Sequence, residues 1–212
     1  MTTRVTVLVA FGAVISTNLA VAQGGSGADS PSVVSSIPPP EFAPMTRSER
    51  FSYYLRGLVD GEAVLRAAAS AGIRQAMNSP KEWGGGAEAY GERVGNGFAE
   101  HIINRTVQSG MAAALHEDNR YFVSGQTGFF RRTKYAIKST LLARHDNGNQ
   151  YFSFSRIGGA ASAGFISRLW QPRSTNSAGD GAESFGITMA SDVGFNVFRE
   201  FWPDLKRHFK KE

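Results

Sequence analysis

Residues 87–110, AEAYGERVGNGFAEHIINRTVQSG, decide the fold of this chain. Small residues recur at every fourth position, at Ala87, Gly91, Gly95 and Ala99, and this spacing keeps them on one face of an α-helix. A glycine inside a helix costs ~1 kcal/mol relative to alanine, so a series of them needs a structural reason. Faces without side chains let two helix backbones pack closely. The stretch therefore predicts a helix over about 87–115 that contacts other helices at short distance.

Four further segments have helical patterns, and three of them repeat the small-residue face. The capping box Thr46-Arg47-Ser48-Glu49 predicts the start of a helix that runs to about residue 77. The other expected helices span 129–144, 156–170 and 182–212. The glycines expected at helix contacts are Gly57, Gly61, Gly91, Gly95, Gly159, Gly164, Gly186 and Gly194. We predict a mostly all-α fold, a compact bundle of about five helices, and the aromatic alternation at 150–154 allows one short strand.

The N-terminal region predicts export. Arg4 is followed by an apolar stretch at 5–15 and by the small-x-small sequence Ala20-Val21-Ala22, which is the order of parts in a cleavable signal peptide over residues 1–22. Residues 23–44 are rich in Gly, Ser and Pro and predict a disordered tether. Residues 45–212 are then long enough for a single helical domain.

Composition narrows the function classes. The net charge of +5 falls to +4 when residues 1–22 are removed, which is too mild for a nucleic-acid partner. The chain has no cysteine, and this excludes thiol catalysis and cysteine-bound zinc or iron–sulfur clusters. We expect no cofactor.

Two glutamates are candidate catalytic residues. Glu62 and Arg66 stand four residues apart on a predicted helix, where they form either a structural ion pair or, if Glu62 were unpaired and buried, a carboxyl group suited to acid catalysis. The pair Glu183-Ser184 resembles the Glu-Ser element of lytic transglycosylases, whose glutamate acts as general acid and base on peptidoglycan. That resemblance covers these two residues, and the Gly-Leu-Met-Gln-type segment that follows in the family is absent.

The densest polar clusters offer weak candidates for metal ligands: His116, Asp118, His145 and Asp146. Imidazole and carboxylate groups suit a hard or borderline ion. Neighbouring positions on a helix point in different directions, however, and such residues also end helices and start turns. We therefore favour the structural role.

The C-terminal segment predicts an amphipathic helix with an aromatic stripe and a basic flank. A helix of this kind either lies on an anionic membrane or packs its aromatic face on its own bundle. The candidate contact residues are Phe198, Phe201, Trp202, Leu205 and Phe209, with Lys206, Arg207, Lys210 and Lys211.

Taken together, these patterns favour an exported, non-enzymatic protein of the cell envelope. Its C-terminal helix would place it at a membrane face, with an anionic lipid surface or another envelope protein as partner. Two alternatives stay open. One is a cell-wall-directed hydrolase or lyase with a buried glutamate, and the other is a membrane-embedded helical oligomer built on the small-residue faces. Charges scattered along the expected helices argue against the second alternative.

Overall fold

A computed structural model describes residues 42–209 of the chain. Within this range the chain forms six α-helices and a three-stranded sheet, so the predicted mostly helical fold is confirmed. The helices are α1 (Arg47–Leu58), α2 (Gly61–Ala76), α3 (Gly86–Ala114), α4 (Phe129–Leu141), α5 (Phe154–Ile166) and α6 (Ala178–Phe209). Short 3₁₀ helices lie at Lys81–Trp83, Ser167–Leu169 and Arg173–Thr175. The predicted signal peptide and residues 23–41 of the predicted tether lie outside the described residues.

The helix predicted over 46–77 is two helices. It begins with the expected capping box, in which the Thr46 amide donates to Oε2 of Glu49 at 2.7 Å and the Glu49 amide donates to Oγ1 of Thr46 at 3.3 Å. Asp60 then starts α2, because its Oδ1 accepts the amide of Ala63 at 2.8 Å. An aspartate side chain that accepts a backbone amide at the N-terminus of a helix stabilises a new helix start, so α1 ends before Asp60 and α2 begins after it. The sequence prediction of one long helix was wrong at this point.

The sheet is small and antiparallel, in the order β1 (Glu117–Asp118), β2 (Leu142–His145) and β3 (Gln150–Phe152). Strand β3 confirms the short strand that the aromatic alternation allowed. Glu117 pairs with His145, and Ala143 pairs with Tyr151. The turn between β2 and β3 includes Gly148, whose φ of 81° favours glycine. The sheet brings Glu117 next to the start of α5.

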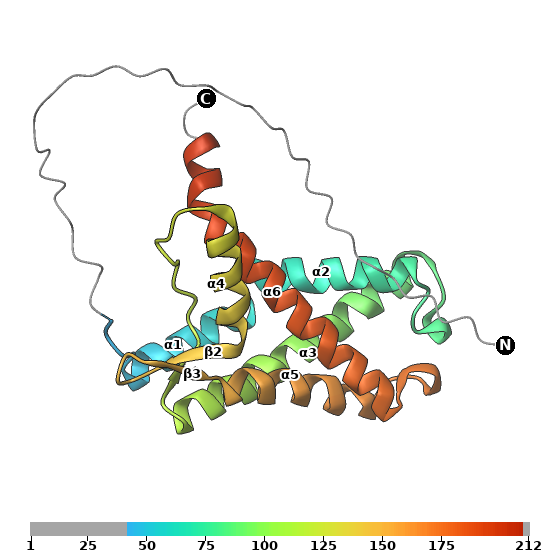
Figure 1. Ribbon diagram of the computed structural model, residues 1–212. Coiled ribbons are helices and arrows are strands. Elements are labelled where there is room, and N and C mark those ends of the chain that lie inside the picture. The colour runs from blue at the N-terminus through green and yellow to red at the C-terminus, as the bar shows by residue number, and fades with distance from the viewer. Residues whose placement is uncertain (1–41, 210–212) are drawn as a thin grey trace, which may run out of the picture. The chain divides into compact units, whose positions relative to one another are not determined.

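The helices pack around α3, α5 and α6. Helix α3 contacts α1, α2 and α5, while α6 contacts α5 and α4. Figure 1 shows α6 crossing the bundle diagonally, and its C-terminal part rises beside α4 away from the other helices. The C-terminal half of α6 therefore has α4 as its main neighbour.

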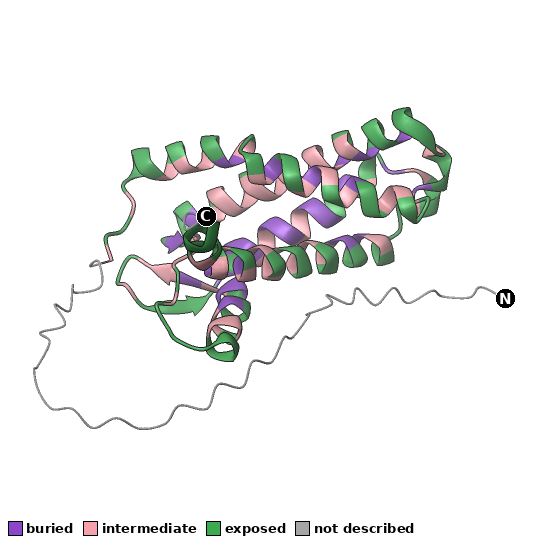
Figure 2. Ribbon diagram, turned by 90° about the horizontal axis from the view of Figure 1, so that it is seen from above, coloured by how far each residue is buried: buried purple, intermediate pink, exposed green. Residues whose placement is uncertain are grey.

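The interior holds alanines and polar side chains in place of large apolar ones. Among residues 42–209, no Leu, Ile, Val, Phe, Met, Tyr or Trp is buried. The interior instead contains charged side chains with full hydrogen bonding, such as Arg93, Glu117, Asp118 and Glu200. Figure 2 shows the buried positions along the inner sides of the helices. Because full burial of one large apolar side chain contributes ~1.5–3 kcal/mol, this interior relies on polar contacts and close alanine packing.

Large apolar side chains are correspondingly exposed on several helices, among them Phe51, Phe130, Leu169, Trp202 and Phe209. Extended exposed apolar surface marks contact with a partner or a membrane. Over residues 42–209, the structure contains no helix with the length and apolarity required to cross a bilayer.

The predicted glycine faces are only partly used. A Cβ atom at Gly164 would lie 2.6 Å from the carbonyl oxygen of Gly181, and one at Gly159 would lie 2.8 Å from the carbonyl oxygen of Asn104. Helix backbones approach closely at both positions, between α5 and α6 and between α5 and α3. Gly57 instead makes room for a side chain, the guanidinium group of Arg105.

The other five glycines of the prediction do not mediate helix contacts. Apart from chain neighbours and the backbone of the same helix, no described atom lies within 4 Å of a Cβ built at Gly61, Gly91, Gly95, Gly186 or Gly194. The four-residue spacing does align Gly91 and Gly95 on one face of α3, but α3 packs on its neighbours through other faces, at Ala89, Arg93, Asn96 and Gly97. Residue spacing predicts which residues share one face of a helix, but it does not predict whether that face contacts another helix or solvent.

Candidate functional site

Four of the five residues of the predicted aromatic stripe of α6 are exposed to solvent. Phe198 and Trp202 are each 48% exposed, Leu205 is 41% exposed and Phe209 is 69% exposed. The Phe198 and Trp202 rings pack on each other with centroids 5.1 Å apart. Phe201 differs, because its ring stacks on Phe129 of α4 at 5.3 Å. Lys206 is exposed beside the stripe, whereas Arg207 is exposed on the Glu200 side of the helix and pairs with Asp204 at 2.5 Å. Lys210 and Lys211 lie outside the described residues.

The opposite, polar side of α6 makes the contact with the bundle through Glu200. Its carboxylate is fully buried and accepts the hydroxyl of Tyr121 at 2.7 Å, the amide and hydroxyl of Ser124 at 3.0 and 2.5 Å, and Nε of Arg132 at 3.1 Å. Burial alone would raise the pKa of Glu200, but these donors outweigh it and hold the pKa below its ordinary value. Arg132 also bonds Asp204 and the Glu200 carbonyl. The buried Glu200 carboxylate and its donors, which we call the Glu200 anchor, therefore orient α6 so that the aromatic stripe lies on the opposite side of the helix.

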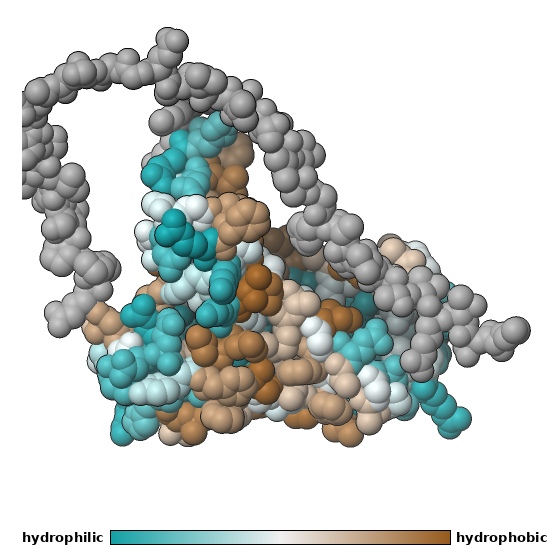
Figure 3. All heavy atoms as spheres, viewed as in Figure 1, coloured by the Kyte–Doolittle hydropathy of each residue, from teal (hydrophilic) through white to brown (hydrophobic). Residues whose placement is uncertain are grey.

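Helix α4 adds a second apolar and basic surface next to α6. Phe130 is 85% exposed and Ile137 is also exposed. Basic side chains accompany them on the solvent-facing part of the helix: Arg131, Lys134 and Lys138. Figure 3 shows hydrophilic and hydrophobic side chains adjoining one another where α4 and the end of α6 project. We call the exposed residues of α4 and of α6 after position 197 the projecting surface.

Glu62 and Arg66 form part of an ion-pair network between α2 and α6. Arg66 contacts Glu62 at 2.8 Å and Asp192 at 2.7 Å, and Arg199 contacts Glu62 at 2.5 Å. Burial raises the pKa of Glu62, but Arg199 and Arg66 outweigh burial and leave the pKa lowered. Acid catalysis at neutral pH needs the opposite shift, so these contacts favour the structural ion pair over the acid role for Glu62. The pair is a structural link.

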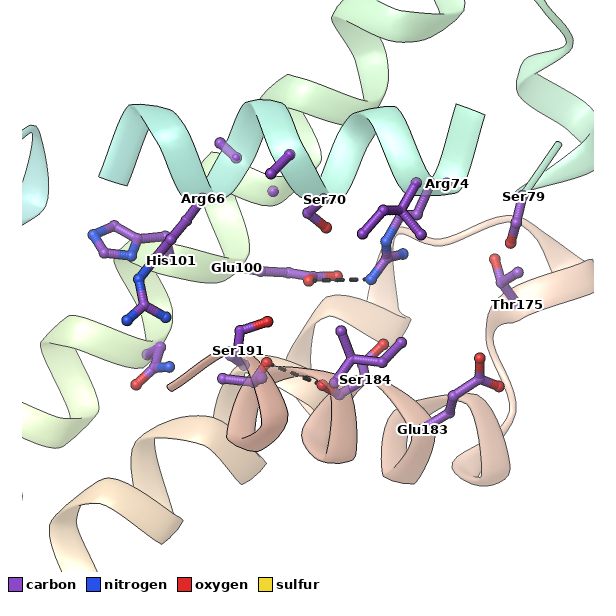
Figure 4. Close-up of a pocket in the computed structure, with 18 of the residues that line it drawn as sticks. Arg66, Ser70, Arg74, Ser79, Glu100, His101, Thr175, Glu183, Ser184 and Ser191 are labelled. Carbon is purple, nitrogen blue, oxygen red and sulfur yellow. Dashed lines mark hydrogen bonds and ion pairs between the residues drawn. The ribbon is translucent and has the colours of Figure 1, made fainter. Parts of the chain in front are cut away.

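Glu183 lines a cleft of about 240 Å³ between α2, α3 and α6. Figure 4 shows Glu100 in the middle of this cleft and Glu183 at its end, near Thr175. Glu100 contacts Arg74 at 3.5 Å and Arg168 at 3.2 Å, whereas Glu183 is exposed. Glu183 therefore lacks the enclosed setting that a glutamate acid needs. Sequence analysis missed Glu100 as a cleft residue, because nothing local distinguishes it from other charged positions on α3.

The candidate metal ligands do not converge. Asp118 is buried against Arg120 at 2.6 Å, while Asp146 joins Arg50 at 2.8 Å and the exposed His116 at 2.9 Å. His145 packs edge-on to the Tyr151 ring. In the part of the chain that the structure describes, no three histidine or carboxylate side chains gather as ligands. The arginines already neutralise these carboxylates, so the candidate metal site is not formed.

Glu117 is a buried carboxylate that sequence analysis did not single out. It accepts the hydroxyls of Ser153 and Ser155 at 2.8 and 2.5 Å and the amides of Phe154 and Ser155 at 3.1 and 3.2 Å. It therefore satisfies the free amides at the start of α5, where negative charge is favourable. This role is structural.

Comparison with known proteins gives no match among family models, curated proteins or solved structures.

Proposed function

We propose that this protein is exported to the cell envelope and acts there without catalysis, by binding the surface of an anionic membrane through its projecting surface. The observation that carries the proposal is the orientation of α6. A terminal amphipathic helix that simply docks on its own bundle buries its aromatic stripe. Here the polar side with Glu200 faces the bundle, and Phe198, Trp202, Leu205 and Phe209 face outward.

The exposed apolar side chains can contribute several kcal/mol to membrane binding. Full burial of a large apolar side chain contributes ~1.5–3 kcal/mol, so inserting these four half-exposed side chains contributes about 3–6 kcal/mol. Basic residues near an anionic leaflet add ~1 kcal/mol each. Arg131, Lys134, Lys138 and Lys206 are exposed on the same two helices. The combination of apolar and basic side chains is typical of proteins that bind at the membrane interface. The basic side chains favour an anionic lipid surface as the partner.

A pair of matched substitutions tests this. Phe209 and Phe51 are similarly exposed, at 69% and 61%, but Phe51 lies on α1, outside the projecting surface. In the processed protein as purified from cells, Phe209→Ala should weaken binding to phosphatidylglycerol vesicles about tenfold, and Phe51→Ala should leave it unchanged. Vesicle flotation at two salt concentrations measures both, and high salt should weaken wild-type binding.

Fluorescence locates the contact. In a background where Trp83 and Trp170 are replaced by Phe, the emission of Trp202 should shift to the blue when vesicles are added. The proposal fails if vesicles leave that emission unchanged, or if Phe51→Ala weakens binding as much as Phe209→Ala does.

A further inference from the structure

A second cavity, of about 300 Å³, lies where α1, α2, α3, α5 and α6 meet, away from the projecting surface. Its lining holds five arginines but only three carboxylates. The arginines are Arg56, Arg66, Arg105, Arg156 and Arg199, and the carboxylates are Asp60, Glu62 and Asp192. The lining therefore carries two more positive than negative charges.

The three carboxylates are already engaged elsewhere in the lining. Glu62 pairs with Arg66 and Arg199, and Asp192 pairs with Arg66. Asp60 accepts the amide that starts α2. Among the described residues, three arginines of the lining have no carboxylate partner, namely Arg56, Arg105 and Arg156, and Arg56 is exposed to solvent.

Arg156 is a buried cation with neutral partners. It is 9% exposed, and it donates to the carbonyl of Ser139 at 2.8 Å and to the side-chain and backbone oxygens of Asn119, both at 3.0 Å. Within residues 42–209, no carboxylate lies within 4.0 Å of its nitrogens. Burial lowers the pKa of Arg156, and this effect prevails although the more distant charges of Asp192 and Glu117 raise that pKa. A charge in this setting is costly without a counterion.

Arg105 is held in place by packing against Gly57 and by a cation-π contact with Tyr53. Its guanidinium group lies against Gly57, where an added Cβ would come 2.0 Å from Nη2, and it lies 5.1 Å from the centre of the Tyr53 ring. Its Nε is buried, and no acceptor for it exists among the described residues. Gly57 and Tyr53 thus position an arginine whose hydrogen-bonding capacity is unused.

His101 lies beside these groups and responds to their charge. Its Nε2 is 2.8 Å from the carbonyl of Gly57. Burial lowers the pKa of His101, and the positive charges of Arg105 and Arg66 act in the same direction, while the Gly57 carbonyl and Asp60 oppose them. An anion in the cavity would offset those charges and raise this pKa.

We propose that the cavity binds a small phosphate-bearing anion between Arg105 and Arg156. A phosphate monoester carries about −1.5 to −2 charges at pH 7, which matches the excess of two positive charges in the lining. Guanidinium groups bind phosphate oxygens with paired, charge-assisted hydrogen bonds. The amides of Asn104 and Gln108 also line the cavity and suit the hydroxyl groups of a small organic phosphate.

Calorimetric titration with inorganic phosphate at pH 7 tests the site. Arg105→Met should weaken phosphate binding at least about tenfold. The control Arg47→Met removes the same charge from an exposed position on α1 and should bind as wild type does. Without phosphate, Arg105→Met should melt at or above the wild-type temperature, because it removes a cation that has no partner. A structural arginine predicts a lower melting temperature.

NMR of the His101 ring gives an independent signal. Phosphate should raise the pKa of His101 in wild type and leave it unchanged in Arg105→Met. Glycerol 3-phosphate and vesicles of phosphatidic acid, used separately, show whether the phosphate group belongs to a soluble ester or to a lipid. The proposal is overturned if wild type binds none of the three probes at millimolar concentration, or if Arg105→Met binds phosphate with wild-type affinity.

Discussion

Replacement of Glu200 by glutamine tests the anchor that turns the aromatic stripe of α6 outward. Glu200→Gln keeps the shape of the side chain but replaces one carboxylate oxygen with an NH₂ group. The wild-type oxygens accept four hydrogen bonds, from Tyr121, Ser124 and Arg132. In either orientation of the amide, its NH₂ group faces at least one donor of these partners, and Arg132 loses a charged partner.

The cost follows from those contacts. A buried donor left without an acceptor costs ~1–3 kcal/mol, and breaking a buried ion pair by removing one charge costs ~3–5 kcal/mol. We therefore expect Glu200→Gln to lower the free energy of unfolding by about 3–5 kcal/mol. For a domain of this size each kcal/mol shifts the melting temperature by ~2–4 °C, so the shift should be about 10 °C.

Calorimetric or circular-dichroism melts at pH 7 measure this shift, with Glu183→Gln as control because Glu183 is an exposed acid on the same helix. The pKa of Glu200 is lowered in the folded protein, so its contribution is present above the ordinary value of 4.5 and is lost as the pH falls through the lowered value. The difference between wild type and Glu200→Gln should accordingly narrow in acid. If Glu200→Gln melts at the same temperature as wild type at pH 7, the structural role of Glu200 is refuted.

Three further predictions concern helices α2, α3 and α5. Gly95→Ala should raise the free energy of unfolding by ~0.5–1 kcal/mol, because space is open there, whereas Gly159→Ala should lower it by ~1–3 kcal/mol, because its Cβ would meet α3; urea unfolding that gives both the same sign would contradict this. The pKa of His101 is lowered in the folded state, so wild-type stability should fall as the pH drops below 6.5. His101→Gln should weaken this loss, as melts at pH 7.5 and 5.5 would show. Glu62→Gln should cost about 1–2 kcal/mol, since the pair is only partly buried; an unchanged urea midpoint would argue against the network.

Local sequence signals predicted local structure well. The capping box at Thr46, the long helix α3 and the strand β3 each depend on residues close together in the chain. The break at Asp60 was also a local signal, because aspartate is a favoured N-cap residue, and the sequence prediction did not use it. The candidate sites were harder to predict, since the partners of Glu200 and Arg156 lie on other elements of the fold.

The sequence by itself determined that the chain is helical, that α6 has an aromatic and a polar side, and that Gly91 and Gly95 share a face. A 3.6-residue period records which residues lie together on a helix and contains no information on which side packs. Only the tertiary structure decided that α6 packs through Glu200, because Tyr121 and Arg132, which satisfy its buried charge, are 79 and 68 residues away in the chain. A buried carboxylate is tolerated only where such donors converge, and their convergence is a property of the whole fold.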